Sequence, residues 1–314
     1  MKSPIKLSIV VINWNTRVLL HHCLSSIKNN PPSCSFEILV IDNASDDESV
    51  IMLADEFPDA RVIHNNQNIG FAAGNNQAIK KSNGNILLFL NPDTVVLGDA
   101  IDKLLCFIEE NPNAGVVGPQ LLNPDHTIQP SSQVFPSLLS TFVDATLLFR
   151  LKPLKGIGER FDLRYWSHDE IRSVDWITGA CMLIRREVIK QVGGMDESYF
   201  MYSEETDWCF RIRKAGWDIV FYPEAKIIHI GGASASQRID RMKSTWIRSY
   251  IFFYYKHYGV LQASIARFIM TCGYLWRLLI WGILYLTSRS KRRTAGQMIH
   301  QWSSSLEWCL FGKI

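Results

Sequence analysis

Asp93 is the side chain in this sequence best placed to bind a metal ion. It follows the apolar run Leu87–Leu90, from which Asn91 and Pro92 separate it. Four apolar residues that stop at Asn-Pro predict a short buried strand, and the ligands of open α/β sheets collect beyond such strand ends. Because Pro92 fixes its own φ and keeps Asn91 extended, the carboxylate of Asp93 could hold a divalent cation against a phosphate. Asn-Pro-Asp is also a common turn, and the motif alone leaves that interpretation open.

A cluster of three acids, Glu204, Glu205 and Asp207, could supply acid–base chemistry. They fall in the first turn of a helix predicted after Ser203. The partial positive charge of a helix N-terminus favours acids there for purely structural reasons. Three carboxylates are more than a cap needs, however, and one of them could act as a general base. The residues alone do not assign that role to one of the three.

His229 is a further candidate for the metal site. It lies near the end of the strand predicted at 225–230, and only Ile230 separates it from the pair Gly231-Gly232. A single histidine is more often structural than a ligand. Beside glycines at a strand end, it becomes a candidate ligand through its neutral ring nitrogen.

The elements that must position these residues alternate between strand and helix patterns. Strands are predicted at 7–12, 36–41, 61–64, 86–90, 115–118, 174–184, 217–222 and 225–230. Helices are predicted at 18–28, 48–57, 72–82, 99–110 and 185–192. This alternation predicts right-handed βαβ units and a mostly parallel sheet, whose strand ends lie on one edge. The region from about 126 to 175 lacks a sustained period and is predicted to be a long loop region with short helices.

Composition excludes several classes of function. A net charge of +3 over 314 residues is too small to indicate a nucleic-acid partner. The seven cysteines are scattered without a C-x-x-C pair, which is typical of reduced thiols and not of a zinc site. No apolar run near the N-terminus resembles a secretory signal. The glycines form neither a G-x-G-x-x-G nor a G-K-[ST] pattern, which argues against a nicotinamide enzyme and an ordinary NTPase.

Taken together, these motifs resemble the family 2 glycosyltransferases, the inverting enzymes with the GT-A fold. The similarity is greatest to bacterial rhamnosyltransferase-like members that build cell-surface polysaccharides, and it covers roughly 7 to 256. The matching segments are Ser8–Asn15, Asp42–Asp46, Asn68–Asn75, Leu90–Asp93, Gly118–Asp125, Gly179–Arg186, Glu204–Arg211 and His229–Ser234. Each segment is weakly specific alone, but their order along the chain is highly specific. The fold expected from the resemblance is a Rossmann-like, mostly parallel sheet flanked by helices.

The resemblance implies a role for several of these residues in binding a nucleotide-sugar donor. Asp42 is expected to recognise a pyrimidine base. The other residues implied at the donor are Asn13, Asn15, Asn43, Asn68, Gly70, Asn75 and Asn91. Asp93 occupies the place of the family's D-x-D motif and should bind Mg²⁺ or Mn²⁺, with His229 completing the metal site. Asn91 stands where many members have a first aspartate, so one negative charge is missing.

The resemblance also implies the chemistry. Glu205 stands where the family's catalytic aspartate usually lies, with Glu204 and Asp207 as the other candidates. A carboxylate would take the proton of an acceptor hydroxyl as that oxygen attacks the anomeric carbon from the far side, which inverts its configuration. The Q-x-x-R-W signature of processive synthases is absent from the sequence. We therefore expect transfer of a single sugar per acceptor.

The C-terminal region has a different character. Phe268–Thr287 is a 20-residue apolar stretch interrupted by Arg277. Such a helix could cross a bilayer, but an arginine near its middle costs about 2.5–3.5 kcal/mol on insertion scales. One face is apolar and is followed by a basic cluster, Arg289 to Arg293, which favours a helix lying in the membrane interface. A helix packed on the catalytic domain or in a dimer interface is the alternative.

These observations predict a catalytic domain at 1–241, with a donor half at about 1–118 and an acceptor half at about 119–241. A helical, membrane-associating region follows at 242–314. The predicted activity is metal-dependent transfer of one sugar, with rhamnose as a candidate, from a dTDP- or UDP-linked donor to a lipid-linked glycan. The predicted location is the cytoplasmic face of the inner membrane, as a peripheral or monotopic protein. A sugar nucleotidyltransferase and a non-catalytic carbohydrate-binding scaffold are the alternatives.

Overall fold

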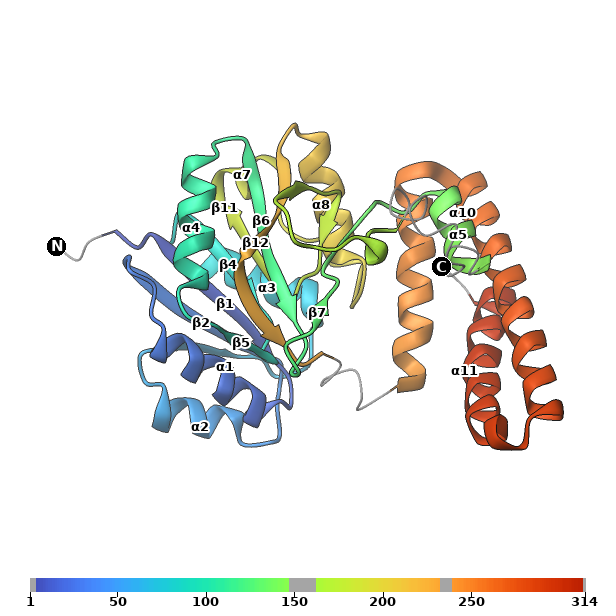
Figure 1. Ribbon diagram of the computed structural model, residues 1–314. Helices are drawn as coiled ribbons and strands as arrows, with labels where there is room; N and C mark the ends of the chain where they lie inside the picture. Colours follow the sequence, from blue (N-terminus) through green and yellow to red (C-terminus); the bar gives the residue numbers. More distant parts are fainter. Residues whose placement is uncertain (1–3, 147–161, 232–238, 313–314) are drawn as a thin grey trace. The chain divides into compact units, whose positions relative to one another are not determined.

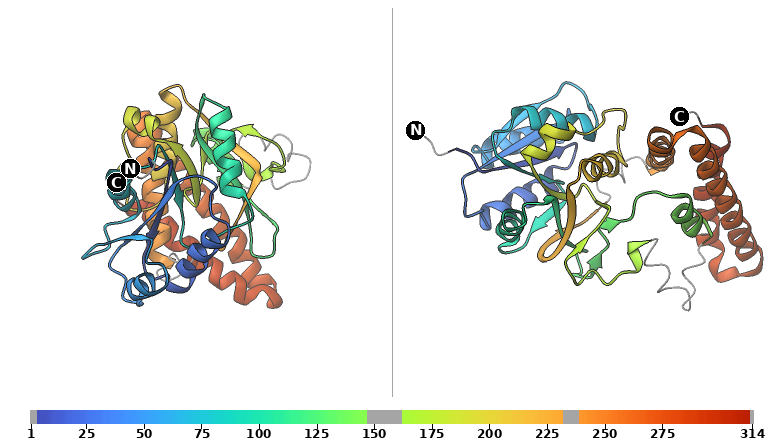
Figure 2. Two further views of the ribbon diagram at one scale, coloured as in Figure 1. Left: turned by 90° about the vertical axis from the view of Figure 1, so that its left-hand side faces the viewer. Right: turned by 90° about the horizontal axis from the view of Figure 1, so that it is seen from above.

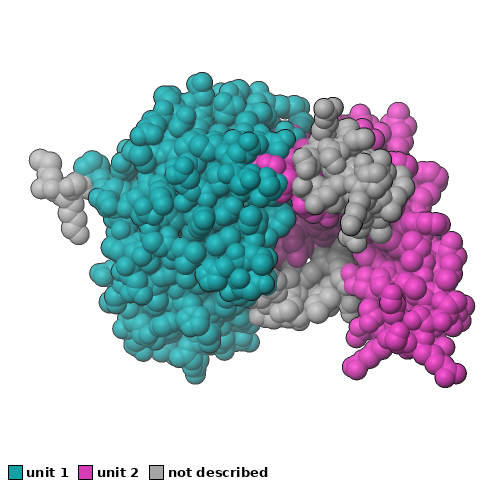
Figure 3. Space-filling view, in the orientation of Figure 1, with its two compact units in different colours: residues 1–133, 167–200, 204–237 teal, residues 134–166, 201–203, 238–314 magenta. Residues whose placement is uncertain are grey.

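The computed structural model describes residues 4–146, 162–231 and 239–312. It divides into two compact units (Figure 3). Unit 1 comprises residues 1–133, 167–200 and 204–237, and unit 2 comprises residues 134–166, 201–203 and 238–314. Each unit is described by itself below. The domain limits expected from the sequence, 1–241 and 242–314, stay a prediction.

Unit 1 is built on one large, twisted, mostly parallel sheet (Figure 1). The order of its main strands is β3-β2-β1-β4-β11-β6-β12-β5. Their bounds are β1 Leu7–Asn13, β2 Phe36–Asp42, β3 Arg61–His64, β4 Ile86–Leu90, β5 Thr94–Val96, β6 Ala114–Leu122, β11 Cys181–Arg185 and β12 Asp218–His229. Pairing shows that β3, β2, β1, β4, β6 and β12 run in one direction, while β11 and β5 run against them. Short strands β7 Ile128–Gln129 and β9 Arg172–Ser173 extend the sheet, and β8 Ser132–Gln133 pairs with β10 Trp176–Ile177 in a separate ribbon.

Helices cover both faces of this sheet (Figures 1 and 2). Their bounds are α1 Arg17–Asn29, α2 Ser49–Glu56, α3 Phe71–Lys81, α4 Ala100–Glu110, α7 Arg186–Val192 and α8 Glu204–Lys214. The core between α1, α2, α4 and the sheet includes Leu88 and Leu90 of β4. Because alternate residues of a strand face opposite sides, Phe89 points the other way and packs edge-on against Trp208 of α8. The expected mostly parallel sheet flanked by helices is therefore confirmed.

Four of the predicted strands differ from the structure by more than one residue in their bounds, and the short strands β5, β7, β8 and β9 were not predicted. The strand expected at 174–184 breaks at residues 178–180 into β10 and β11, which belong to different sheets. The strands expected at 217–222 and 225–230 are instead one strand, β12, with a register shift between Tyr222 and Lys226. The strand expected at 115–118 continues through Pro119 to Leu122. In each case the apolar pattern located the strand, whereas pairing with neighbouring strands determined its length.

Unit 2 is helical. Its elements are α5 Leu138–Thr146, the short 3-10 helix η3 Leu163–Tyr165, α10 Ile239–Thr287, the 3-10 turn η4 Arg289–Lys291 and α11 Arg292–Phe311. Gly259 interrupts α10 with φ 86° and ψ 174°, so this element consists of two helical segments joined at a kink. A core of Ile247, Ile251, Tyr254, Ala263, Ala266, Met270, Tyr274 and Cys309 lies between α10 and α11.

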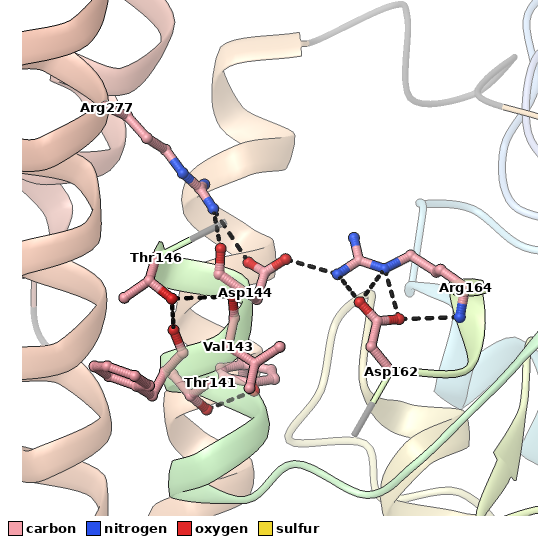
Figure 4. Close-up of polar contacts among 9 residues, drawn as sticks. Thr141, Val143, Asp144, Thr146, Asp162, Arg164 and Arg277 are labelled. Atoms are coloured by element: carbon pink, nitrogen blue, oxygen red, sulfur yellow. Dashed lines mark hydrogen bonds and ion pairs between the residues drawn. The ribbon is translucent and has the colours of Figure 1, made fainter. Parts of the chain in front are cut away.

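Arg277 is the charged residue within the apolar stretch of α10, and it is buried against the rest of unit 2. Its Nη2 donates to the backbone oxygen of Asp144, at 2.6 Å, and lies 3.4 Å from the carboxylate of the same residue. Its guanidinium also lies over the Trp302 ring, 4.7 Å from the centroid. Asp144 in turn pairs with Arg164, which binds Asp162 (Figure 4). The charge that interrupts the apolar sequence therefore has protein partners.

Candidate active site at the carboxyl edge of the sheet

Three polar residues form a row at the carboxyl ends of neighbouring parallel strands. Asn13 ends β1, Asp42 ends β2 and His64 ends β3, and pairing places each directly beside the next. Asn13 Nδ2 donates to Asp42 Oδ1 at 2.8 Å, and His64 Nδ1 lies 2.9 Å from Asp42 Oδ2. The backbone nitrogen of Ser45 donates to the same Oδ2 at 3.0 Å. The predicted gathering of polar strand ends on one edge is thus confirmed for β1, β2 and β3, and the role of these residues at a donor stays a prediction.

Asn15 and Asn43 belong to the loops that follow β1 and β2. Ser45 Oγ accepts from the backbone nitrogen of Asn15 and from Asn13 Nδ2, which joins the two loops. Asn43 Nδ2 donates to the backbone oxygen of Gly70, and Asn43 Oδ1 accepts from Asn65. These hydrogen bonds connect the loops after β1 and β2 to each other and connect Asn43 to Gly70 and Asn65.

Asn68, Gly70 and Asn75 shape the start of α3. Asn68 Oδ1 accepts from the backbone nitrogen of Gly70, and Asn75 Nδ2 donates to the backbone oxygen of Phe71. Gly70 has φ 89°, and a Cβ there would lie 2.9 Å from the backbone oxygen of Phe200. Only glycine fits both conditions without strain. These three residues organise the loop that contacts Asn43.

Asp93 and His229 meet at the same edge, where β5 and β12 pair. His229 pairs directly with Thr94, and its Nε2 lies 3.4 Å from Asp93 Oδ1. The backbone nitrogen of Ile230 also donates to the backbone oxygen of Asp93. Both side chains are largely buried, with 9% of Asp93 and 15% of His229 exposed. The structure therefore brings together the two residues named from the sequence as metal ligands.

Gln129 determines which nitrogen of His229 carries the proton. Gln129 Nε2 donates to Asn123 Oδ1 and to the backbone oxygen of His229, so its Oε1 is the atom that faces His229 Nδ1, at 2.6 Å. An amide oxygen accepts, and Nδ1 of His229 must therefore donate. In the neutral imidazole the lone pair of Nε2 then faces the carboxylate of Asp93. Two electron-pair donors facing each other are suited to a cation between them, and a partner on the far nitrogen is the usual support of a metal-binding histidine.

The donor set fits a divalent ion that is shared with a substrate. Within the described residues, no group of three or more His, Cys, Asp or Glu side chains could enclose a metal. Mg²⁺ and Mn²⁺ are commonly held by one or two protein ligands plus phosphate oxygens and water. One carboxylate oxygen and one imidazole nitrogen meet that requirement only if phosphate supplies further ligands.

The acids at the start of α8 lie beside the segment that follows β10. A Cβ built on Gly179 would lie 3.9 Å from Cβ of Glu205. The next residue, Ala180, accepts through its backbone oxygen from the nitrogen of Asn91 at 2.9 Å. Residues 179–180 thus connect the first turn of α8 with the strand end that carries Asn91 and Asp93.

Burial gives Glu204 and Glu205 unusual acidities. It raises the pKa of Glu205 to about 7, and burial together with the negative charge of Glu205 raises the pKa of Glu204 well above its usual range. Oε2 of each residue is buried without a hydrogen-bond partner among the described residues. Glu205 keeps some exposure, whereas Glu204 is 4% exposed. A carboxyl group with a pKa near 7 can accept or release a proton at neutral pH.

Asp207 differs from the two glutamates because it is paired. Its Oδ2 accepts from Nε of Arg211 at 2.9 Å, and its side chain is completely buried. Arg211 also donates to the backbone oxygens of Val192 and Gly194, at the end of α7. This pair links α8 to the loop after α7.

Sequence reasoning missed two residues of this edge, His64 and Gln129. His64 was recognisable as the last residue of a predicted strand, and the lateral register of β2 and β3 was the missing information. Gln129 lies in the region without sustained periodicity, and no local pattern indicates that it would reach His229.

Comparisons with known proteins identify the family of this chain. A profile described as "Glycosyl transferase family 2" matches residues 8–193. An N-acetylglucosaminyl-diphospho-decaprenol L-rhamnosyltransferase of Mycobacterium tuberculosis is 30% identical over 252 residues, which cover 73% of this chain and 78% of that protein. Rhamnosyltransferase WbbL of Escherichia coli is 28% identical over 169 residues, or 51% of this chain and 60% of that protein.

A solved structure shows the same fold. The mannosyltransferase PcManGT of Pyrobaculum calidifontis, in complex with GDP-Man and Mn2+, aligns with a TM-score of 0.61 and 14% identity, covering all of this chain and 89% of that one. The GT-A fold and the glycosyltransferase activity expected from the sequence are therefore confirmed. This chain belongs to glycosyl transferase family 2.

Proposed function

We propose that this glycosyltransferase moves one sugar, with rhamnose as the leading candidate, from a dTDP- or UDP-linked donor to a lipid-linked glycan in cell-surface polysaccharide synthesis. The names of its relatives support the sugar and the acceptor: one is an L-rhamnosyltransferase acting on N-acetylglucosaminyl-diphospho-decaprenol, and another is an O-antigen biosynthesis protein of Myxococcus xanthus. The observation that supports the proposal most directly is that two groups of residues lie near the same edge of the sheet. These are the Asp93–His229 pair and the buried acids of α8.

Asp93 and His229 would hold Mg²⁺ or Mn²⁺ beneath the diphosphate of the donor. Such an ion, when bound, stabilises the negative charge that develops on the departing diphosphate. The tautomer that Gln129 imposes on His229 suits this role, since it directs a lone pair toward Asp93. The mannosyltransferase and a GalNAc-T7 structure with the same fold both contain Mn2+, which supports a divalent ion here.

Glu205 is the proposed general base. Its pKa of about 7 lets it take the proton of an acceptor hydroxyl at neutral pH while the acceptor oxygen bonds to the anomeric carbon. The bond from that carbon to the diphosphate breaks on the opposite side, so a single displacement inverts the configuration. Glu204 is less accessible, and Asp207 is already paired with Arg211. These differences favour Glu205 among the three acids named from the sequence.

The C-terminal helices support association with a membrane surface. Among the described residues, one helix, Thr245–Thr287, has the length and apolar composition of a membrane span, although core helices of soluble proteins can have both. Large apolar side chains are exposed along its second segment: Phe268, Leu275, Trp276, Leu279, Ile283 and Leu286. The basic residues Arg289, Lys291, Arg292 and Arg293 follow directly. An interfacial position on the cytoplasmic face would place the enzyme on the surface that holds a lipid-linked acceptor.

Transfer to a defined acceptor tests the proposal. The purified chain is incubated with Mn²⁺, dTDP-rhamnose and N-acetylglucosaminyl diphosphate on a polyprenyl chain, and the product is analysed by mass spectrometry and NMR. We expect addition of one rhamnose with an anomeric configuration opposite to that of the donor. UDP-glucose and UDP-galactose serve as alternative donors in the same assay. Retention of configuration, or transfer that persists in EDTA, would contradict the mechanism, and efficient transfer from a UDP-sugar alone would contradict rhamnose.

Family membership weighs against the two alternatives that the sequence left open. A nucleotidyltransferase would form a sugar nucleotide from a nucleoside triphosphate, and a scaffold would bind glycans without turnover. Formation of a sugar nucleotide from a sugar phosphate and dTTP or UTP is the outcome that would revive the first alternative.

A further inference from the structure

We propose that Phe200 binds the acceptor by stacking its ring against a face of the acceptor's terminal sugar ring. This inference rests on the proposed function, because it takes Glu205 as the group that receives the proton of the acceptor hydroxyl. It deepens that function by naming a residue that binds the acceptor and orients its sugar.

Phe200 lies in the segment between α7 and α8, and one edge of its ring rests against Gly70. A Cβ built on Gly70 would lie 3.0 Å from Cδ2 and 3.2 Å from Cε2 of Phe200. The backbone oxygen of Phe200 accepts from the nitrogen of Phe71 at 3.2 Å. Even so, 53% of Phe200 is exposed, whereas the preceding residue, Tyr199, is buried. The ring is therefore attached along one edge and open to solvent elsewhere.

The segment that carries Phe200 is fixed by polar contacts. Asn76 of α3 holds both backbone groups of Met195, because its Oδ1 accepts from the nitrogen at 2.9 Å and its Nδ2 donates to the oxygen at 2.8 Å. Arg211 of α8 donates to the backbone oxygen of Gly194 at 2.8 Å. An exposed apolar side chain is common and needs no explanation by itself. A ring on a fixed segment, however, loses little further entropy when it binds a ligand.

Phe200 lies on the side of the site that holds the proposed base. Phe71, whose nitrogen binds Phe200, places its own ring beside Gly179, with Cε1 3.3 Å from a Cβ built on that glycine. The Cβ of Glu205 lies 3.9 Å from the same built atom. Phe71 and Gly179 therefore connect Phe200 with the first turn of α8.

The direction of the displacement assigns this side to the acceptor. The acceptor oxygen bonds to the anomeric carbon on the face opposite the departing diphosphate, which Asp93 and His229 would hold through the metal ion. Glu205 takes the proton of that oxygen in the proposed reaction. The acceptor sugar must therefore lie beside Glu205, where the open ring of Phe200 is available to it.

An aromatic ring suits a sugar because a pyranose chair has apolar faces. Its axial C–H bonds point out of the mean plane of the ring, whereas its equatorial hydroxyl groups point outward around the rim. The negatively polarised face of an aromatic ring attracts such C–H groups, and stacking removes apolar surface of both rings from water. The contact orients the sugar without engaging its hydroxyl groups, so the attacking hydroxyl stays free for Glu205.

Steady-state kinetics with each substrate varied in turn tests this assignment. The acceptor is N-acetylglucosaminyl diphosphate on a polyprenyl chain, and the donor is dTDP-rhamnose, or UDP-glucose or UDP-galactose if that sugar is transferred instead, with Mn²⁺ present. Phe200→Ala should raise the KM for the acceptor about tenfold and leave the KM for the donor unchanged. Phe200→Trp should restore a KM near that of the unchanged protein, because it keeps an aromatic face. Phe200→Leu, which is apolar but has no ring, should recover only a small part.

Ile171→Ala is the matched control, because Ile171 is 52% exposed and also belongs to unit 1. It should change neither KM. The melting temperature of each variant and its affinity for the nucleoside diphosphate of the donor report whether the fold and the donor site are retained. Both should be the same in Phe200→Ala as in the unchanged protein.

The outcomes separate this inference from the proposed function. An unchanged acceptor KM in Phe200→Ala, or full recovery in Phe200→Leu, would overturn the stacking role while transfer itself is retained. A rise confined to the donor KM would overturn it as well. Loss of nucleotide affinity and of melting temperature in Phe200→Ala would show that the ring only supports the loop at Gly70. Absence of transfer from every donor by the unchanged protein would contradict the proposed function and this inference together.

Discussion

Oδ1 of Asp93 lies 3.4 Å from Nε2 of His229, although one residue follows β4 and the other ends β12. Gln129 faces the other ring nitrogen of His229 at 2.6 Å and fixes the lone pair toward the carboxylate. The arrangement joins segments from three parts of the chain at one strand edge. It explains how an Asn-Pro-Asp turn, which is ordinary in sequence, becomes half of the proposed cation site.

The proposed metal site predicts that the two Asn-Pro-Asp motifs differ sharply in their contribution to Mn²⁺ binding. Asp93→Asn should abolish the Mn²⁺-dependent rise in melting temperature that dTDP or UDP produces. The control is Asp125→Asn in the second Asn-Pro-Asp motif, where the exposed carboxylate of Asp125 only bonds Thr127. This control should keep the full effect of Mn²⁺. Equal losses in both variants would show that Asp93 is not a specific ligand.

The base predicts loss of turnover with retention of donor binding. Glu205→Gln removes the carboxylate that we propose takes the acceptor proton, and we expect kcat to fall about 10²–10⁴-fold. In the unchanged enzyme, kcat/KM should rise with pH through about 7, because only the ionised carboxylate of Glu205 accepts a proton. Measuring transfer and dTDP binding in parallel checks this. Full activity of Glu205→Gln together with inactivity of Glu204→Gln would move the role to Glu204.

Replacing Glu205 by glutamine should raise the free energy of unfolding, and the gain should depend on pH. The pKa of Glu205 is raised in the folded protein from 4.5 to about 7, so its contribution to stability is complete below about pH 4.5 and is lost as the pH rises through 7. Glu205→Gln cannot ionise and avoids this loss, which corresponds to about 3 kcal/mol. Urea unfolding should therefore show little difference between the two proteins at pH 4.5 and a more stable variant at pH 8. If the difference in free energy of unfolding between the two proteins did not depend on pH, the raised pKa of Glu205 would not be its cause.

Replacing Arg277, the buried cation of unit 2, should lower the free energy of unfolding. Arg277→Ala removes the bond to Asp144 and the contact with the Trp302 ring, and we expect a cost of roughly 2 kcal/mol because Asp144 is half exposed and can be hydrated. Arg289→Ala, at an exposed position in the turn after α10, is the control and should cost about 0–0.5 kcal/mol. Denaturant unfolding followed by circular dichroism measures both. Equal costs would show that the partners of Arg277 contribute nothing.

The exposed face of α10 predicts binding to lipid vesicles. The intact protein should sediment with vesicles that contain anionic lipid. Replacing Phe268, Trp276 and Leu279 together by serine should weaken this association at least about tenfold, because their burial in the interface is lost. Replacing Val18, Ile51 and Ile171, which are as exposed but lie in unit 1, is the matched control. A similar loss in both triple variants would argue against a specific membrane face.

The sequence by itself determined most of the longer strands and the helices of unit 1, and the ordered set of motifs that reveal the family. Local patterns suffice for this, since buried strands such as Ile86–Leu90 and amphipathic helices such as Ala100–Glu110 each carry their period within a few residues. The resemblance then named Asp93, His229 and the acids of α8 as candidate site residues. It could not distinguish Glu205 from Asp207, because both lie in the same turn of one helix.

Only the tertiary structure decided the pKa, the tautomer and the hydrogen-bond partners of the candidate site residues. Burial raises the pKa of Glu205 to about 7, whereas Arg211 and the backbone at the end of α7 engage the neighbouring Asp207. His64 and Gln129 became part of the site through contacts with residues far away in the chain. Burial, tautomer and pairing depend on which segments meet, and that information is non-local. The local pattern of a sequence therefore names candidate residues, and the packing around them determines what each can do.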